Sequence, residues 1–177
     1  MKIADLTFEV LIEAGSIAKR VDQLAQQLNT EYAGRTPIFI GVLNGSFLFV
    51  ADLVKRMTIP CEVTFTKLAS YYGGTSTTRK IREDIELSVD ISGRHIIILE
   101  DIVDTGNTLS YLIEKLKTHA PASVQVCSLL LKPGKLESSI EELRYVGFEI
   151  ENEFVVGYGL DYQELGRNLP DIYRQIS

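Results

Sequence analysis

Three acidic residues lie close together near the middle of the chain, within Glu100-Asp101-Ile102-Val103-Asp104. They are followed at once by Thr105-Gly106-Asn107-Thr108, a composition typical of a turn and a helix start. Backbone N–H groups at a helix start, together with the two threonine hydroxyls, can hold a phosphate group. Because carboxylates repel phosphate, we expect the three acids to serve other atoms: sugar hydroxyls, a magnesium ion, or a proton on a base.

A simpler interpretation fits each of these residues taken singly. Asp and Thr are common in loops at strand ends, and they often cap a helix without binding a ligand. The complete string is a more specific motif than any of its members, and it favours the functional interpretation.

The segments on either side predict how this string is positioned. The four apolar residues from Ile96 to Leu99 predict a strand buried on both faces, as in a parallel sheet covered by helices. Apolar residues at helical spacing follow from Leu109 to Leu116. Ligands of open α/β sheets sit beyond the carboxyl ends of strands, so we expect the three acids to face one crevice there.

Two other buried strands end in polar residues. Residues 37–43 predict a strand, followed by the turn Asn44-Gly45-Ser46 and an apolar helix over 47–57. A strand over 123–131 ends at Lys132. Both strand ends are placed for ligand binding. The alternative for the turn at Asn44 is a plain strand–helix connection, and the alternative for Lys132 is a solvated surface lysine.

The rest of the chain gives weaker signals. Residues 1–15 predict no element, and residues 69–80 combine Ser70-Tyr71 with two glycines and no hydrophobic period, which predicts a lid or a disordered loop. The remaining predicted elements are a helix over 16–34 and strands at 60–68, 85–91, 145–149 and 154–162.

Composition places the chain among ordinary globular proteins. Its 177 residues suit one α/β domain spanning 1–177, and its net charge of −6 argues against a nucleic-acid partner. The sequence contains neither a run of 18 apolar residues nor a signal-peptide pattern, so we expect no membrane partner and a cytoplasmic location. Cys61 and Cys127 lie in apolar or β-branched runs, which favours free thiols in a reducing compartment.

The segment from Glu100 to Leu109 resembles the phosphoribosyl-diphosphate-binding motif of type I phosphoribosyltransferases, in the form used by the hypoxanthine (hypoxanthine-guanine) branch. Further segments within residues 37–170 are similar to that family in the same order: Leu43–Ser46, Ser70-Tyr71, Lys132, and Phe154–Tyr162 with Arg167. The resemblance implies an α/β fold with a mostly parallel twisted sheet flanked by helices, a small hood from the chain termini, and a mobile lid loop.

The resemblance also implies a reaction. Ribose 5-phosphate is transferred from phosphoribosyl diphosphate to a 6-oxopurine, hypoxanthine or guanine, giving IMP or GMP and diphosphate in purine salvage. It implies that Asp104 takes the proton of the attacking purine nitrogen, and that Glu100 and Asp101 hold the ribose hydroxyls. The residues it places around the 5-phosphate are Asp104, Thr105, Gly106, Asn107 and Thr108.

The same resemblance assigns the other groups. It places the purine against Lys132, Phe154, Val155 and Asp161. It places the diphosphate against Asn44, Gly45 and Arg167, with an unusual cis peptide before Asn44. It places Mg²⁺ beside Glu100, Asp101 and Asp161, and the lid at Ser70 and Tyr71.

One position departs from the family pattern. The family usually has Lys or Arg where this chain has Asn44, so we expect weaker binding of the diphosphate group or altered coupling to a neighbouring subunit. The family suggests a homodimer or homotetramer. The alternative function, from another class, is a non-catalytic regulator of the same fold that senses nucleotides or binds RNA. The preference among hypoxanthine, guanine and xanthine stays open.

Overall fold

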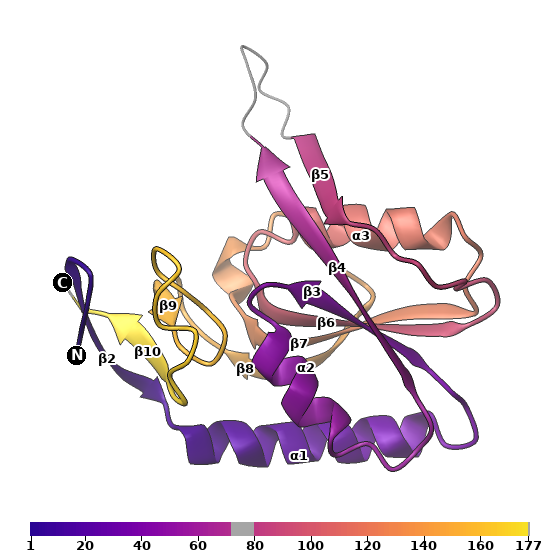
Figure 1. Cartoon of the computed structure of the whole chain (residues 1–177), viewed down its shortest axis with the longest axis horizontal. Helices are drawn as coiled ribbons and strands as arrows, with labels where there is room; N and C mark the ends of the chain where they lie inside the picture. The colour runs from indigo at the N-terminus through magenta and orange to yellow at the C-terminus, as the bar shows by residue number, and fades with distance from the viewer. Residues whose placement is uncertain (72–79, 177) are drawn as a thin grey trace.

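The structure is a computed structural model that describes residues 1–71 and 80–176, without the side chains of residues 69–71 and 80–83. Its main sheet has the strand order β5-β4-β3-β6-β7-β8, and all strands run parallel except β5, which is antiparallel to β4 (Figure 1). The strands are β3 (Ile38–Leu43), β4 (Glu62–Tyr71), β5 (Lys80–Ile85), β6 (His95–Val103), β7 (Ser123–Leu131) and β8 (Leu143–Glu149).

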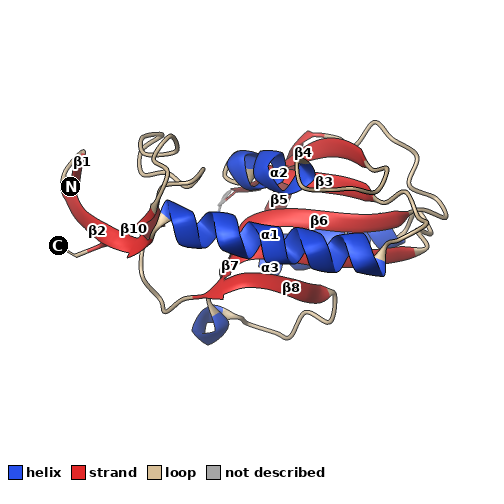
Figure 2. Cartoon of the chain, turned by 90° about the horizontal axis from the view of Figure 1, so that it is seen from below, coloured by secondary structure: helices blue, strands red, loops and turns tan. Residues whose placement is uncertain are grey.

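Helices cover both faces of this sheet. Helices α1 (Ala14–Glu31) and α2 (Phe47–Val54) lie on one face, and α3 (Asn107–Lys117) lies on the other (Figure 2). Successive strand residues point to opposite faces, so Ile97 packs in the core beneath α1 and α2 while its neighbours Ile96 and Ile98 pack beneath α3. The predicted run of apolar residues in β6 is therefore buried on both sides.

A second, smaller sheet joins the two ends of the chain. Its strand order is β1-β2-β10-β9, and it lies beside the carboxyl ends of the main strands (Figure 1). The strands are β1 (Lys2–Ile3), β2 (Leu6–Ile12), β9 (Val155–Val156) and β10 (Ile172–Gln175). We call this sheet and the loop 157–171 the hood. The predicted architecture, including a hood from both termini, is confirmed.

Several element boundaries differ from the sequence prediction. The predicted strand over 85–91 does not form. The preceding strand β5 ends at Ile85, and Leu87, Val89 and Ile91 lie in a loop and pack in the core beneath α3. The predicted strand over 154–162 ends after Val156, because Gly157 (φ 100°) and Gly159 (φ 101°) turn the backbone into the left-handed region.

The predicted lid at Ser70 and Tyr71 lies at the limit of the description. The backbones of these two residues end β4, opposite Ile81 and Lys80 of β5, and their side chains lie outside the described part of the chain. Within the described ranges, no helix is long and apolar enough to cross a membrane.

Candidate active site

A cavity of about 170 Å³ opens where β6 ends and α3 begins. Gly106 makes the connection with φ 83°, and α3 starts at the next residue. The first backbone N–H groups of a helix have no backbone acceptor within the helix, so a helix start is a common site for binding an anion. Here the Asn107 N–H lies 3.5 Å from the Thr105 hydroxyl oxygen. The residues that line the cavity are Val42, Glu100, Ile102, Val103, Asp104, Thr105, Gly106, Thr108 and Leu109.

The structure thus brings most of the predicted phosphate loop to one place. Asn107 is not among the lining residues, and its side-chain amide donates a 2.9 Å hydrogen bond to the carboxylate of Glu137. Glu100 and Asp104 line the same cavity as the loop, whereas Asp101, the third acid expected to face this crevice, is not among the lining residues.

Asp104 has two oxygens in different surroundings. Its Oδ2 lies 3.5 Å from Nζ of Lys132 and 3.4 Å from Nζ of Lys135. Its Oδ1 is buried and has no hydrogen-bond partner among the described residues. A buried carboxylate oxygen without a partner is costly, so this atom is suited to accept a hydrogen bond or a proton from a bound ligand.

Glu100 and Asp101 are acids that burial keeps from ionising easily. Glu100 is 7% exposed, and its pKa is raised well above the usual value by burial and by the neighbouring carboxylate of Asp101. Burial also raises the pKa of Asp101 to about 6, although backbone N–H groups and Arg167 oppose the shift. A bound cation, or hydroxyl groups that donate hydrogen bonds, would therefore stabilise the ionised forms of both carboxylates.

The raised pKa of Asp101 predicts a pH-dependent stability. The folded protein holds this proton more tightly than the unfolded chain does, so stability falls as pH rises from about 4 to about 6 and stays lower above that. We expect Asp101→Asn, which keeps the acceptor for the Ile102 N–H, to raise the free energy of unfolding at pH 7 by about 1–2 kcal/mol. Thermal unfolding of the parent and the variant without ligands, at pH 4 and at pH 7, measures this difference in stability.

The matched control is Asp90→Asn, because Asp90 is an exposed carboxylate that accepts a 2.9 Å bond from the Ser92 N–H. We expect little change in stability from this variant at either pH. An Asp101→Asn protein that is no more stable than the parent at pH 7, or equally stabilised at both pH values, contradicts the assignment.

The turn at Asn44 and Gly45 meets two distant segments. The peptide bond between Leu43 and Asn44 is cis, as the family resemblance implied. A Cβ on Gly45 would lie 1.6 Å from Oδ2 of Asp101, so only glycine fits against that carboxylate. A Cβ on Gly159 would lie 2.0 Å from the carbonyl oxygen of Gly45, so the hood also contacts this turn closely.

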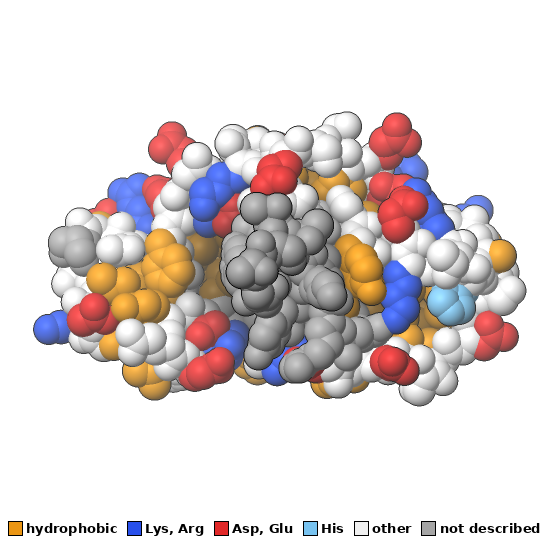
Figure 3. Space-filling model, turned by 90° about the horizontal axis from the view of Figure 1, so that it is seen from above, with side chains coloured by type: hydrophobic (Ala, Val, Ile, Leu, Met, Phe, Trp, Pro, Cys, Tyr) orange, Lys and Arg blue, Asp and Glu red, His pale blue; other side chains and the backbone are white. Residues whose placement is uncertain are grey.

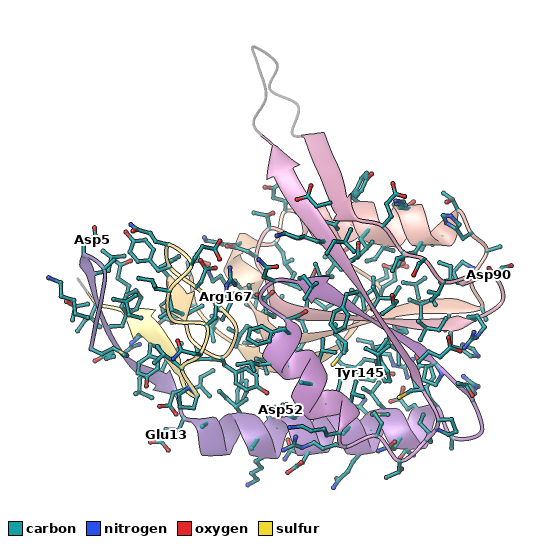
Figure 4. The ribbon with its side chains drawn as sticks, viewed as in Figure 1. Asp5, Glu13, Asp52, Asp90, Tyr145 and Arg167 are labelled. Atoms are coloured by element: carbon teal, nitrogen blue, oxygen red, sulfur yellow. The ribbon has the colours of Figure 1, made fainter. Side chains whose placement is uncertain are left out.

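Arg167 and Asp161 lie in the same hood loop. Arg167 donates a 2.9 Å hydrogen bond to the carbonyl of Gly159 and forms a 2.8 Å ion pair with Asp161. Both charges act on the carboxylate of Asp101. Figure 4 shows Arg167 where the hood loops face the main sheet. Two of the predicted diphosphate residues, Gly45 and Arg167, thus lie near Asp101, and Asn44 directly precedes Gly45.

The predicted purine residues come from β7 and from the hood. Lys132 follows β7 and is 5% exposed, so it is not a solvated surface lysine, and its Nζ lies 3.5 Å from the Asp104 carboxylate. Phe154 is 42% exposed, and its ring meets Tyr162 edge-on with centroids 5.7 Å apart, which leaves aromatic surface open for a ligand. Val155 is buried in β9.

Sequence reasoning missed two contributors to this site. Lys135 shares the Asp104 carboxylate with Lys132, and the Tyr158 hydroxyl donates a 2.7 Å bond to Asp52 of α2, which ties the hood loop to the main domain. Neither contact follows from hydrophobic periodicity. A second lysine three residues after Lys132, within a short turn, was the available signal for the first of them.

Residues 11–163 match the phosphoribosyl transferase domain, and the chain belongs to this family. Within it, the chain is 42% identical to the hypoxanthine phosphoribosyltransferase of Salmonella typhimurium, over 93% of both proteins. It is 43% identical to the hypoxanthine-guanine phosphoribosyltransferase of Streptococcus pneumoniae, over 93% of this chain and 91% of that protein. The chain is therefore a member of the hypoxanthine phosphoribosyltransferase family.

Solved structures agree. A crystal structure of a hypoxanthine-guanine phosphoribosyltransferase from Bacillus anthracis superposes with a TM-score of 0.90 at 35% identity, covering 98% of this chain and all of that one. The chain also matches the bifunctional protein TilS/HprT of Listeria monocytogenes at 42% identity, where it spans about a quarter of the relative's length. The family resemblance found in the sequence is confirmed.

Proposed function

We propose that this chain is a purine-salvage transferase that moves ribose 5-phosphate from phosphoribosyl diphosphate to hypoxanthine or guanine. The bond from the sugar carbon to diphosphate breaks, a bond from that carbon to a purine nitrogen forms, and the purine proton passes to Asp104. The names of the relatives support the substrates. The single observation that carries the proposal is the Asp104 carboxylate, which has one oxygen buried without a described partner and the other beside Lys132.

The sugar phosphate occupies the crevice at the end of β6 in this proposal. Backbone N–H groups and hydroxyls of residues 105–108 hold the 5-phosphate, because a helix start concentrates donors and positive potential there. Glu100 and Asp101 accept hydrogen bonds from the ribose hydroxyls. The raised pKa values of both acids, caused first by burial, are consistent with groups that await such donors or a cation.

The purine binds between the hood and the end of β7. Phe154 supplies an exposed ring for stacking, and the backbone of Val155 reads the edge of the base. Lys132 donates to the oxygen that hypoxanthine and guanine share. Asp161 completes this side of the site from the hood loop. The discrimination against xanthine is measured by parallel assays with the three bases.

The diphosphate binds where three segments converge, at Asn44, Gly45 and Arg167. Gly45 packs closely against Asp101, and Gly159 packs closely against Gly45. We propose that the backbone N–H groups of this turn contact the diphosphate. Asn44 supplies no positive charge, so Arg167, already oriented by Asp161, carries the cationic contact. We therefore propose that this chain binds diphosphate more weakly than a chain with lysine at position 44 would.

The acids of the site fit a magnesium ion that the substrate helps to hold. Within residues 1–71 and 80–176, no group of three or more ionisable ligands is arranged to bind a metal alone. Mg²⁺ commonly takes one or two carboxylates and completes its shell with water and phosphate oxygens. Glu100 and Asp101 would hold one such ion and Asp161 a second, and the charge of Mg²⁺ there would stabilise the negative charge of the diphosphate leaving group.

The remaining assignments extend this proposal. Residues 1–177 form one phosphoribosyltransferase domain, the segment at Ser70 and Tyr71 closes over the substrates, and the protein acts in the cytoplasm. The free thiols of Cys61 and Cys127 support a reducing compartment.

Exposed apolar side chains beside α2 support self-association. Val63 and Phe65 of β4 are 41% and 37% exposed on one face of the sheet, and Phe47 at the start of α2 is 39% exposed. We propose that this face forms the contact of a homodimer or homotetramer. Sedimentation of the parent protein and of Phe65→Asp tests it: we expect an oligomer and a smaller species, and a monomeric parent contradicts it.

A spectrophotometric assay with hypoxanthine, phosphoribosyl diphosphate and Mg²⁺ tests the function, and we expect formation of IMP. Figure 3 shows acidic and basic side chains interspersed on one face, without a broad basic patch among the described residues there, which disfavours an RNA-binding regulator. Folded protein that makes no nucleotide but binds nucleotides or RNA tightly overturns the proposal in favour of that regulator.

A further inference from the structure

A second lysine stands beside the carboxylate that the proposed reaction uses. Lys135 is the last residue of the 3₁₀ turn η1 (Pro133–Lys135), and its Nζ lies 3.4 Å from Oδ2 of Asp104. Lys132 approaches the same oxygen at 3.5 Å. The two lysines differ in environment, because 7% of the Lys132 side chain is exposed and 40% of the Lys135 side chain is exposed.

The turn that carries Lys135 is fastened across the start of α3. The Lys135 N–H donates to the Lys132 carbonyl at 3.1 Å, and the Glu137 N–H donates to the Thr105 carbonyl at 3.2 Å. The Glu137 carboxylate accepts a 2.9 Å bond from Asn107. Hydrogen bonds on both sides of Lys135 therefore fix its backbone relative to the phosphate loop.

Side-chain packing adds to this attachment. A Cβ on Gly106 would lie 2.8 Å from Ile140 and 3.3 Å from Leu136, so the segment after Lys135 packs directly on the loop that joins β6 to α3. The ammonium group of Lys135 consequently has a short and defined path to Asp104. Its position follows from the same contacts that shape the phosphate loop.

We propose that Lys135 is a positioning residue that holds Oδ2 of Asp104 and so fixes the orientation of the carboxylate that serves as the proton acceptor. The inference rests on the proposed function, since it concerns the same carboxylate. Because Lys135 supplies the ion pair, Lys132 is free to turn toward the purine oxygen without leaving Asp104 unpaired.

The charges around Asp104 explain why a second lysine matters. The acids Glu100 and Asp101 lie on the same strand end, and Glu137 lies beyond η1. Lys132 and Lys135 face Asp104 from the β7 end and from η1. When the purine engages Lys132, Lys135 still holds the Asp104 carboxylate in its orientation. The proton then moves from the purine nitrogen to the Asp104 carboxylate.

The test compares Lys135→Gln, Lys135→Arg and Lys132→Gln across a range of pH, with the parent enzyme assayed first. We expect Lys135→Gln to lower kcat at pH 7 about tenfold and to leave the KM for hypoxanthine within about twofold. We also expect the pH profile of kcat to differ from that of the parent, because the carboxylate has lost a neighbouring positive charge. Lys135→Arg restores kcat and its pH profile, whereas Lys132→Gln raises the KM for hypoxanthine.

Lys117→Gln is the matched control. Lys117 is 47% exposed and is ion-paired at 2.6 Å to Glu142, but it lies at the far end of α3. We expect the Lys117→Gln enzyme to keep the kcat and the pH profile of the parent. A Lys135→Gln enzyme with the parent profile, or a Lys135→Arg enzyme that fails to recover while its melting temperature is normal, overturns the inference. A parent enzyme that forms no nucleotide rejects the proposed function instead, so the two failures are distinguishable.

Discussion

Asp104→Asn is expected to lower kcat by about 10²–10³-fold, with the KM of each substrate changed by no more than a few-fold. The amide keeps the size of the carboxylate, but it cannot accept the purine proton. The site also loses the negative charge that lies between Lys132 and Lys135. Initial rates with each substrate varied in turn separate kcat from KM.

The control for this variant is Asp90→Asn, which removes an exposed carboxylate from a turn outside the crevice. It leaves the rate unchanged. An Asp104→Asn enzyme with near-parental kcat contradicts the assignment of Asp104 as the base. If kcat were unchanged and only KM rose, Asp104 would act in substrate binding and another group would take the proton.

Gly159→Ala is expected to raise the KM for phosphoribosyl diphosphate at least about tenfold. Gly159 has φ 101°, and an added Cβ would lie 2.0 Å from the carbonyl oxygen of Gly45, so the hood loop must move away from the diphosphate turn. Arg167 moves with it, because its guanidinium donates to the Gly159 carbonyl. A displacement of about 1 Å in a positioning group can cost 10²-fold in rate.

Gly34→Ala is the matched control, because Gly34 also has a positive φ, 76°, while an added Cβ there meets nothing within 4 Å. The Gly34→Ala variant has the same kind of backbone strain, but its added Cβ collides with no other atom. We therefore expect lower thermal stability and a parental KM for phosphoribosyl diphosphate. Equal kinetic effects from the two variants, or a parental KM for Gly159→Ala, contradict the proposed convergence of Gly45, Gly159 and Arg167.

The sequence predicted the parallel core of the fold well. The strand over Ser123–Leu131 has the predicted bounds, and β6 and α3 follow each other in the predicted order. The predicted acidic loop is shorter than expected, because β6 continues through Glu100 and Asp101 to Val103. These elements are long or fully buried, so their residue types alone define them. The family motif then related the separate strand ends to one site.

The hood was harder to predict from residue patterns. β2 has a burial pattern that does not alternate cleanly, and β9 and β10 contain two and four residues. Such strands gain their stability from partners distant in sequence: β10 pairs with β2 across nearly the whole chain. The hood was therefore expected through the family resemblance and not through periodicity.

The candidate site was predicted residue by residue at the ends of strands, but its side-chain contacts were not. The buried state of Lys132 and the convergence of Gly45, Asp101 and Gly159 depend on how three loops meet. The ion pair between Lys135 and Asp104 joins residues 31 positions apart and has no periodic signal. Contacts of this kind require the tertiary structure.

The central claim is that peptide N–H groups at the start of α3 hold the sugar phosphate, which leaves Glu100, Asp101 and Asp104 for the ribose, the metal and the proton. A crystal structure of the protein with bound IMP tests it most directly. We predict the phosphate against residues 104–108 and the purine between Phe154 and Lys132. A phosphate bound elsewhere, with residues 104–108 in contact with solvent alone, contradicts the account.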